Sequence, residues 1–546
     1  MYHATVRQHG LLHLISPPSS TPFTPLNTVR QNTAHGIIPT CMYPMSSFPM
    51  TSDDAEQARA IQCYFADDVH LQTEDDILSF TNLMASSSES CSSLRALHLS
   101  VGKIGPAAAA ALVSLLSKLR TEPSARFTSL EFDGYTEGLL SSSPDLPGAF
   151  ADLTTLKTLR IDQVRTLGAD MVLNMKSSLV SADLGLEVIL DEGVPTLEQR
   201  CMSNPIFLLQ GSQATLEKIK ASGALTDDNV SYRIRYPRVR ELDLDCLDIP
   251  LTYDYVRAFP NASTLSVSSI RFSGDGDMPE ATRYRNANKQ EQDEYGTWGA
   301  LDVVTCSVLD AYLLALRCPV TILQLSLNGT GESQEWCARM LCSVLDDVHP
   351  KVLRLTMGSP RILLRPSLLS ALSLERERPL ETLAIVYEVT AHDTTFIVQE
   401  ALMWILKELT PVPITTFELE LDCKDVYAGE PNVDADGRYL HRSGGTYFID
   451  LDLPELAREF MDFIETVTLV RISLKRHRVR KDASVVLEYD SSKNQHSEDR
   501  ASEDDDQDED EEDDRGSKDG EEHAMSQFCE PESSQAEVER MLIVEG

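Results

Sequence analysis

The residues whose spacing comes nearest to a chemical motif lie in the segment NVDADGRYLHRS, Asn432–Ser443. It opens with alternating Asn and Asp residues followed by glycine, the pattern that begins a calcium-binding loop. Such a loop also needs a bidentate glutamate at its twelfth position, and this chain has Ser443 there. The segment therefore predicts a flexible polar insertion, and no metal site is expected.

A second glycine-containing segment, NGTGES at Asn328–Ser333, follows an expected strand. It lacks the lysine that a phosphate-binding loop needs, so we interpret it as a turn. The chain contains no HExxH, GxSxG or GxxxxGKS/T pattern, and its many carboxylates form no pair in a context that marks acid–base catalysis. The sequence therefore predicts a protein that is not an enzyme, with no catalytic residue and no cofactor.

The one dense group of basic residues is the segment KRHRVRK, whose basic members are Lys475, Arg476, Arg478, Arg480 and Lys481. Such a cluster can act as a nuclear import signal. It can also be a terminal strand whose basic residues face solvent, because they alternate with the inward candidates Ile472, Leu474 and Val479. A third interpretation is that the cluster attracts the acidic tail that follows it in the sequence.

The strongest charge feature is that acidic tail. Residues Glu498–Glu522 include sixteen acidic and three basic residues, a net charge of −13. Like charges at this density predict a disordered segment, and Ser502, followed directly by a run of acidic residues that begins Glu503-Asp504-Asp505, fits the site of an acidophilic kinase. The whole chain carries −38, so −25 remains outside the tail. An acidic body argues against nucleic acid as a partner, because phosphate contacts need a basic surface.

Cysteine usage and hydropathy limit the compartment. The eleven cysteines are scattered and form no CxxC pair, which is typical of a reduced intracellular protein in the cytoplasm, the nucleus or both. No apolar run approaches the roughly 20 residues of a membrane-spanning helix, so no membrane partner is expected.

The element that must position all these groups is a recurring apolar pattern, LxxLxL. Each copy predicts a short strand with alternate residues pointing one way, followed by a segment able to form a helix. The pattern predicts an α/β fold, an irregular solenoid like the leucine-rich repeats, with parallel strands on one face and helices on the other. The strand centres are Leu97, Leu130, Leu159, Leu242, Leu265, Leu325, Leu355, Leu383, Phe417 and Ile472.

The spacing of the copies is uneven. The 83-residue gap after Leu159 has room for two weaker strands, near Leu184 and Ile219. Two polar stretches, Ser273–Gly296 and Lys424–Gly445, are expected to loop out. We predict a disordered Pro/Ser/Thr-rich extension over residues 1–55, a solenoid over 56–490 and a disordered acidic tail over 491–546.

Residues between the repeat leucines would point away from the core and line a concave face. We expect a protein partner to bind there, because the leucines themselves form the core. The candidate partner-binding residues are Arg95, His98, Glu131, Arg160, Glu241, Asp243, Arg354 and Glu418.

The region from Tyr64 onward resembles the part of fungal F-box proteins that follows the F-box. The resemblance rests on YFADDVHLQTEDDILSFTNLMASSSESCSSLRALHLS, RYPRVRELDLDC and RPLETLAIVYE, and covers roughly residues 60–485. It implies a substrate-receptor solenoid of a ubiquitin ligase. The F-box itself, a helical segment with spaced Leu, Ile and Trp, is not visible before residue 60, where PFTPLNTVRQNTAHGIIPTCMYPM stands.

The sequence therefore favours a non-catalytic protein-interaction scaffold, of the substrate-receptor kind. The alternative is a histone-binding or chaperone-like protein that holds a basic partner on its acidic tail.

Overall fold

A computed structural model describes most of the chain between residues 67 and 489. The described ranges are 67–86, 90–187, 196–225, 233–269, 278–327, 334–358, 367–370, 372, 379–389, 395–423, 448, 451–477 and 480–489. All of them belong to one compact unit, Cys63–Gly546. The predicted disordered segments, residues 1–55 and 491–546, lie outside the described residues, and so do the Lys424–Gly445 insertion and Ser502.

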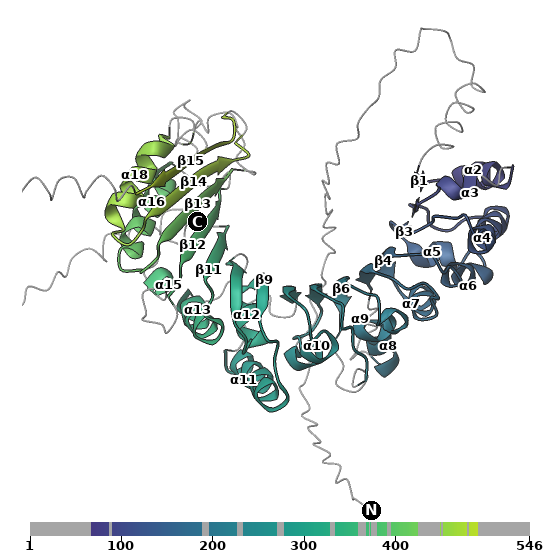
Figure 1. The fold of residues 1–546 in the computed structure, drawn as a ribbon, viewed down its shortest axis with the longest axis horizontal. Coiled ribbons are helices and arrows are strands. Elements are labelled where there is room, and N and C mark those ends of the chain that lie inside the picture. Colours follow the sequence, from purple (N-terminus) through teal and green to yellow (C-terminus); the bar gives the residue numbers. More distant parts are fainter. Residues whose placement is uncertain are drawn as a thin grey trace, which may run out of the picture. The chain divides into compact units, whose positions relative to one another are not determined.

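The described residues form one sheet of fifteen strands whose spatial order is the order of the chain (Figure 1). Strands β1 to β14 pair in parallel, and only β15 pairs antiparallel, with β14. The predicted α/β class with parallel strands is confirmed. The strands are β1 Asp68–Leu71, β2 Ala96–Leu99, β3 Ser129–Phe132, β4 Thr158–Val164, β5 Ser181–Leu186, β6 Lys218–Ala224, β7 Glu241–Cys246, β8 Thr264–Ser269, β9 Leu301–Ser307, β10 Val320–Ser326, β11 Val352–Met357, β12 Thr382–Glu388, β13 Thr416–Asp422, β14 Leu469–Lys475 and β15 Ala483–Glu488.

Helices lie between the strands in sequence, and neighbouring helices contact one another in chain order. Helix α4 illustrates why they form: Pro106 occupies its first turn, an alanine run favours helix, and one face buries Ala108, Leu112 and Leu115. The helices are α2 Glu74–Ser86, α3 Ser90–Ser93, α4 Pro106–Thr121, α5 Thr136–Leu140, α6 Asp145–Ala151, α7 Thr166–Leu173, α8 Leu197–Met202, α9 Pro205–Leu208, η1 Gln210–Ser212, α10 Thr252–Ala258, α11 Met278–Tyr295, α12 Val308–Leu314, α13 Gln334–Val348, α15 Ser367–Ser370, α16 Thr395–Leu409 and α18 Leu453–Phe463.

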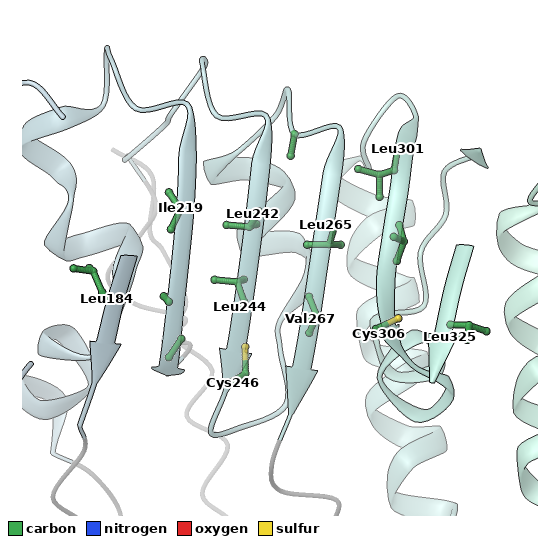
Figure 2. Packing of buried hydrophobic residues seen from close by; sticks show 14 of the residues in the cluster. Leu184, Ile219, Leu242, Leu244, Cys246, Leu265, Val267, Leu301, Cys306 and Leu325 are labelled. Carbon is green, nitrogen blue, oxygen red and sulfur yellow. The ribbon is translucent and has the colours of Figure 1, made fainter. Parts of the chain in front are cut away.

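The repeat leucines form the core, as predicted. All ten predicted strand centres lie in strands and are almost wholly buried, and the two weaker copies are β5 and β6. Figure 2 shows buried side chains of consecutive strands lying beside one another, from Leu184 on β5 to Leu325 on β10. Burial alternates along most strands, so one face of the sheet packs against the helices and the other does not.

The expectation that Ser273–Gly296 loops out is wrong for most of its length. Residues Met278–Tyr295 form α11, whose buried positions include Arg285, Asn288 and Gln292. Asn288 Nδ2 donates to the carbonyls of Pro250 (3.1 Å) and Leu313 (2.8 Å). This helix buries polar side chains that satisfy backbone groups of its neighbours, so it carries no apolar stripe for a sequence pattern to detect.

Candidate functional site

The face of the sheet that does not pack against the helices, called the open face below, carries one continuous row of side chains. Strand register aligns one residue from each of β1 to β14, and the alignment passes unbroken from strand to strand. We call this set the central row. Its members are His70, His98, Glu131, Arg160, Asp183, Lys220, Asp243, Ser266, Thr305, Gln324, Arg354, Ala384, Glu418 and Arg471.

The candidate partner-binding residues belong to this face. His98, Glu131, Arg160, Asp243, Arg354 and Glu418 are members of the central row. Glu241 lies two residues earlier on β7, hence on the same face, and pairs with Lys218 at 2.7 Å. Arg95 directly precedes β2 and lies 3.6 Å from Asp67. Register thus collects residues that are up to 323 positions apart in the sequence into one surface.

The charges of β1 to β6 pair with one another along the row. His98 Nε2 lies 2.7 Å from Asp68, and His98 Nδ1 lies 2.6 Å from Glu131. Arg160 donates to Glu131 at 2.7 Å and lies 3.8 Å from Asp183. Burial raises the pKa of Asp183 from 3.8, although Lys220 and Arg160 lower it. This part of the open face is largely neutralised within itself.

The charges of β11 to β14 also pair. Arg354 donates to Glu420 at 3.0 Å, and Lys475 donates to the same carboxylate at 2.9 Å. Arg471 donates to Glu418 at 2.5 Å. Beneath these pairs Ala384 and Val386 are only 6% and 7% exposed, although they lie on the open face. In this second charged region the ion-paired side chains therefore cover the apolar residues of β12.

Between the two charged regions lies a different surface. The open-face positions of β8, β9 and β10 carry no charge: Thr264, Ser266, Ser268, Val303, Thr305, Ser307, Ile322, Gln324 and Ser326. Asp243 and Asp245 on β7 border this uncharged region. Within the described part of the chain neither has an ion-pair partner, and Asp245 accepts a hydrogen bond from Ser268 at 2.9 Å. We refer to Asp243, Asp245 and the uncharged positions together as the central patch.

The basic cluster lies around the turn between β14 and β15. Arg476 pairs with Asp422, and Arg480 donates to the carbonyls of Phe448 (2.8 Å) and Leu451 (2.7 Å). Ile472 and Leu474 are buried as expected, but β14 ends at Lys475 and β15 follows it, so Arg476, Arg480 and Lys481 do not lie on a terminal strand. Arg478 and Val479 lie outside the described residues, and Lys481 is exposed. Nuclear import by this cluster stays a prediction.

Two residues near the start of the described chain were not predicted from the sequence. Asp68 and His70 lie on β1, beside His98 on β2. The signal that could have found them is the repetition of histidine at one position of two successive strands, DVHL and ALHL. The calcium-like segment Asn432–Ser443 and the whole segment NGTGES, Asn328–Ser333, fall outside the described residues.

The seven described cysteines carry free thiols. Burial raises the pKa of Cys246 and of Cys423 to about 12, so neither thiol is a ready nucleophile. Among the described residues, none of the helices combines the length and hydropathy needed to cross a membrane.

Comparison with known proteins returns nothing: no family model, no curated protein and no solved structure matches this chain.

Proposed function

We propose that this protein is a non-catalytic recognition scaffold that binds a protein partner on the open face of its sheet. The observation that carries the proposal is the central row, in which fourteen parallel strands present side chains in register on a face that the described helices leave free. An extended row of this kind offers many contacts to a macromolecule.

The central patch is the part of the face best suited to a partner. The charges on either side of the patch already form ion pairs within the protein. A partner that used those charges would have to break these pairs and desolvate the charged groups, which opposes binding. Asp243 and Asp245 have no such internal partner among the described residues, and the hydroxyls of β8 to β10 can both donate and accept hydrogen bonds. A partner segment with basic and polar side chains fits this surface.

The strand order supports interpreting the fold as a solenoid like the leucine-rich repeats, and the resemblance to fungal F-box proteins supports a substrate receptor of a ubiquitin ligase. These two are parts of the proposal. The acidic tail offers the alternative, capture of a histone or another basic protein by Glu498–Glu522.

Affinity purification of the full chain followed by mass spectrometry tests the proposal, with three variants run in parallel. The first is the double variant Asp243→Lys/Asp245→Lys in the central patch. Its matched control is Glu459→Lys/Asp462→Lys, which makes the same charge change on exposed positions of α18. The third variant deletes residues 498–522.

We expect the specific partner to disappear with the patch variant, and to persist with the α18 control and the tail deletion. Loss with the tail deletion alone would favour the basic-protein alternative and overturn recognition by the open face. A ligase adaptor among the retained proteins would support the substrate-receptor part of the proposal.

A further inference from the structure

Three potential metal ligands come together at the first two strands of the sheet. Asp68 and His70 lie on β1 and His98 on β2, and one ligand atom from each lies within 4.8 Å of the other two. The parallel register makes this possible, because it aligns His70 with His98 and Asp68 with Ala96, whose small side chain leaves space on the open face. Two imidazoles and a carboxylate form a donor set that suits zinc and neighbouring divalent metals.

The histidine on β2 is held in the orientation that a metal ligand needs. His98 Nδ1 lies 2.6 Å from Glu131 Oε2 on β3, and the second oxygen of Glu131 accepts from Arg160 on β4 at 2.7 Å. A carboxylate at Nδ1 favours a proton on that nitrogen, so Nε2 can present a lone pair to a metal ion that takes the place of its contact with Asp68. That Nε2 faces Asp68, 2.7 Å away, on the side where His70 lies.

The distances are close to those around a bound ion. His70 Nε2 lies 3.8 Å from Asp68 Oδ1. Ligands at the usual zinc distances of about 2.0–2.2 Å are separated from one another by about 3.4 Å in a tetrahedral site. The rings of His70 and His98 stack with centroids 4.1 Å apart and planes 8° apart. Because the lone pairs of stacked rings run parallel, binding one ion requires the exposed His70 ring to turn out of the stack about its side-chain torsions.

Exposure favours entry of an ion. The side chains of Asp68 and His70 are 55% and 59% exposed, whereas that of His98 is 18% exposed and braced by Glu131. One ligand is thus fixed and two are free to adjust, and the outer side of the cluster is open to water.

We propose that Asp68, His70 and His98 bind a divalent transition-metal ion of the zinc type, with Glu131 orienting His98 through its Nδ1 proton. Three protein ligands leave a fourth coordination position for water or a ligand from outside. The proposal stands apart from partner binding at the central patch, because the two regions share no residue.

Binding is measured with Zn²⁺ by titration calorimetry and with Co²⁺ by visible absorption, both on the full chain. Excess Mg²⁺ and about 150 mM salt, where the Debye length is about 8 Å, suppress weak binding by the acidic tail. The variants are His70→Ala, His98→Ala and Glu131→Gln. The matched controls are Asp67→Asn, an adjacent carboxylate outside the cluster, and His349→Ala, a histidine on a distant segment.

We expect wild type to bind one more ion than His70→Ala or His98→Ala, and Co²⁺ to give absorption bands that both variants lack. Glu131→Gln should retain the site with affinity lowered by about 10-fold or more. Both controls should match wild type. His70 is exposed on β1, so its variant tests the site even if His98→Ala unfolds. Equal stoichiometry and affinity in wild type and His70→Ala would overturn the proposal, and an unchanged affinity in Glu131→Gln would overturn the orienting role of Glu131.

Discussion

Arg354 on β11 reaches over β12 and pairs with Glu420 on β13, with 3.0 Å between Nη2 and Oε2. Its register neighbour on β12 is Ala384, and that of Glu420 is Val386. The ion pair therefore spans two small apolar side chains, which explains why both are buried on a face that is otherwise half-exposed. A larger residue at position 384 would block the contact.

Removing Arg354 and Glu420 singly and together should reveal a coupling free energy of about 0.5–1 kcal/mol, because Glu420 is only 19% exposed and the pair covers apolar surface. A double-mutant cycle of alanine substitutions, followed by urea unfolding, measures it. The matched control is Lys351 with Glu381, a 3.6 Å pair whose side chains are 66% and 57% exposed, for which we expect no measurable coupling. Equal coupling in the two cycles would contradict the spanning role.

Gly223→Ala should destabilise the protein by more than about 2 kcal/mol. Gly223 has φ +72°, and a Cβ there would clash with the backbone carbonyl oxygen of Leu186, at the point where the β6 register shifts against β7. Gly296→Ala provides the control, because its φ of +107° is strained for alanine while nothing lies within 4 Å, so about 1 kcal/mol is expected. Thermal unfolding of both variants decides whether the clash adds to the torsional cost.

Asn288→Ala should cost about 2–3 kcal/mol, because it leaves the carbonyls of Pro250 and Leu313 and the N–H of Thr252 unsatisfied inside the protein. Asn286→Ala makes the same change at an exposed position of the same helix and should stay within about 0.5 kcal/mol. Chemical denaturation measures both. Similar small effects would show that α11 does not depend on its buried amide.

Asp310→Asn should change how stability responds to pH. Burial raises the pKa of Asp310 above 3.8 despite hydrogen bonds from Ser269 and Ser307. The folded protein then holds the proton more tightly than the unfolded chain. Wild type should accordingly lose stability relative to the variant as pH rises from 3.8 through the folded pKa. The loss amounts to about 1.4 kcal/mol for each pH unit by which the folded pKa exceeds the unfolded one.

Urea unfolding of wild type and Asp310→Asn across this pH range gives the difference directly. Ser269→Ala removes a hydrogen bond that lowers the same pKa, so it should enlarge the effect. Parallel pH profiles for wild type and Asp310→Asn would refute the assignment.

The ten predicted strands are correct because LxxLxL reports a physical requirement, burial of alternate residues on one face of the sheet. Strand β9 escaped the same reasoning because LDVVTCS runs directly into α12, with Ser307 capping the helix by accepting from Asp310 N–H at 3.0 Å. No separate apolar period marks the boundary there. Strand β15 was not predicted because neither of its faces is buried. Its residues alternate between half-exposed and exposed.

The sequence predicts which residues lie on the open face, but it does not predict which of them contact one another. Alternation alone places His98, Glu131 and Arg160 on one face. That they form a chain of contacts depends on register between strands about 30 residues apart, which is set by the intervening helices and turns. The contact between His70 and His98 also depends on strand register. It could not be predicted because β1 carries no copy of LxxLxL and was not recognised as a strand.

Because the order of strands in space is the order in the chain, each strand of the sheet is held mainly by the strands just before and after it. If the two ends were pulled apart in a force spectrometer, strands would detach one after another from an end, each releasing a short length of chain. The force trace would be a series of small steps, with a distinct event where the antiparallel β15 leaves β14.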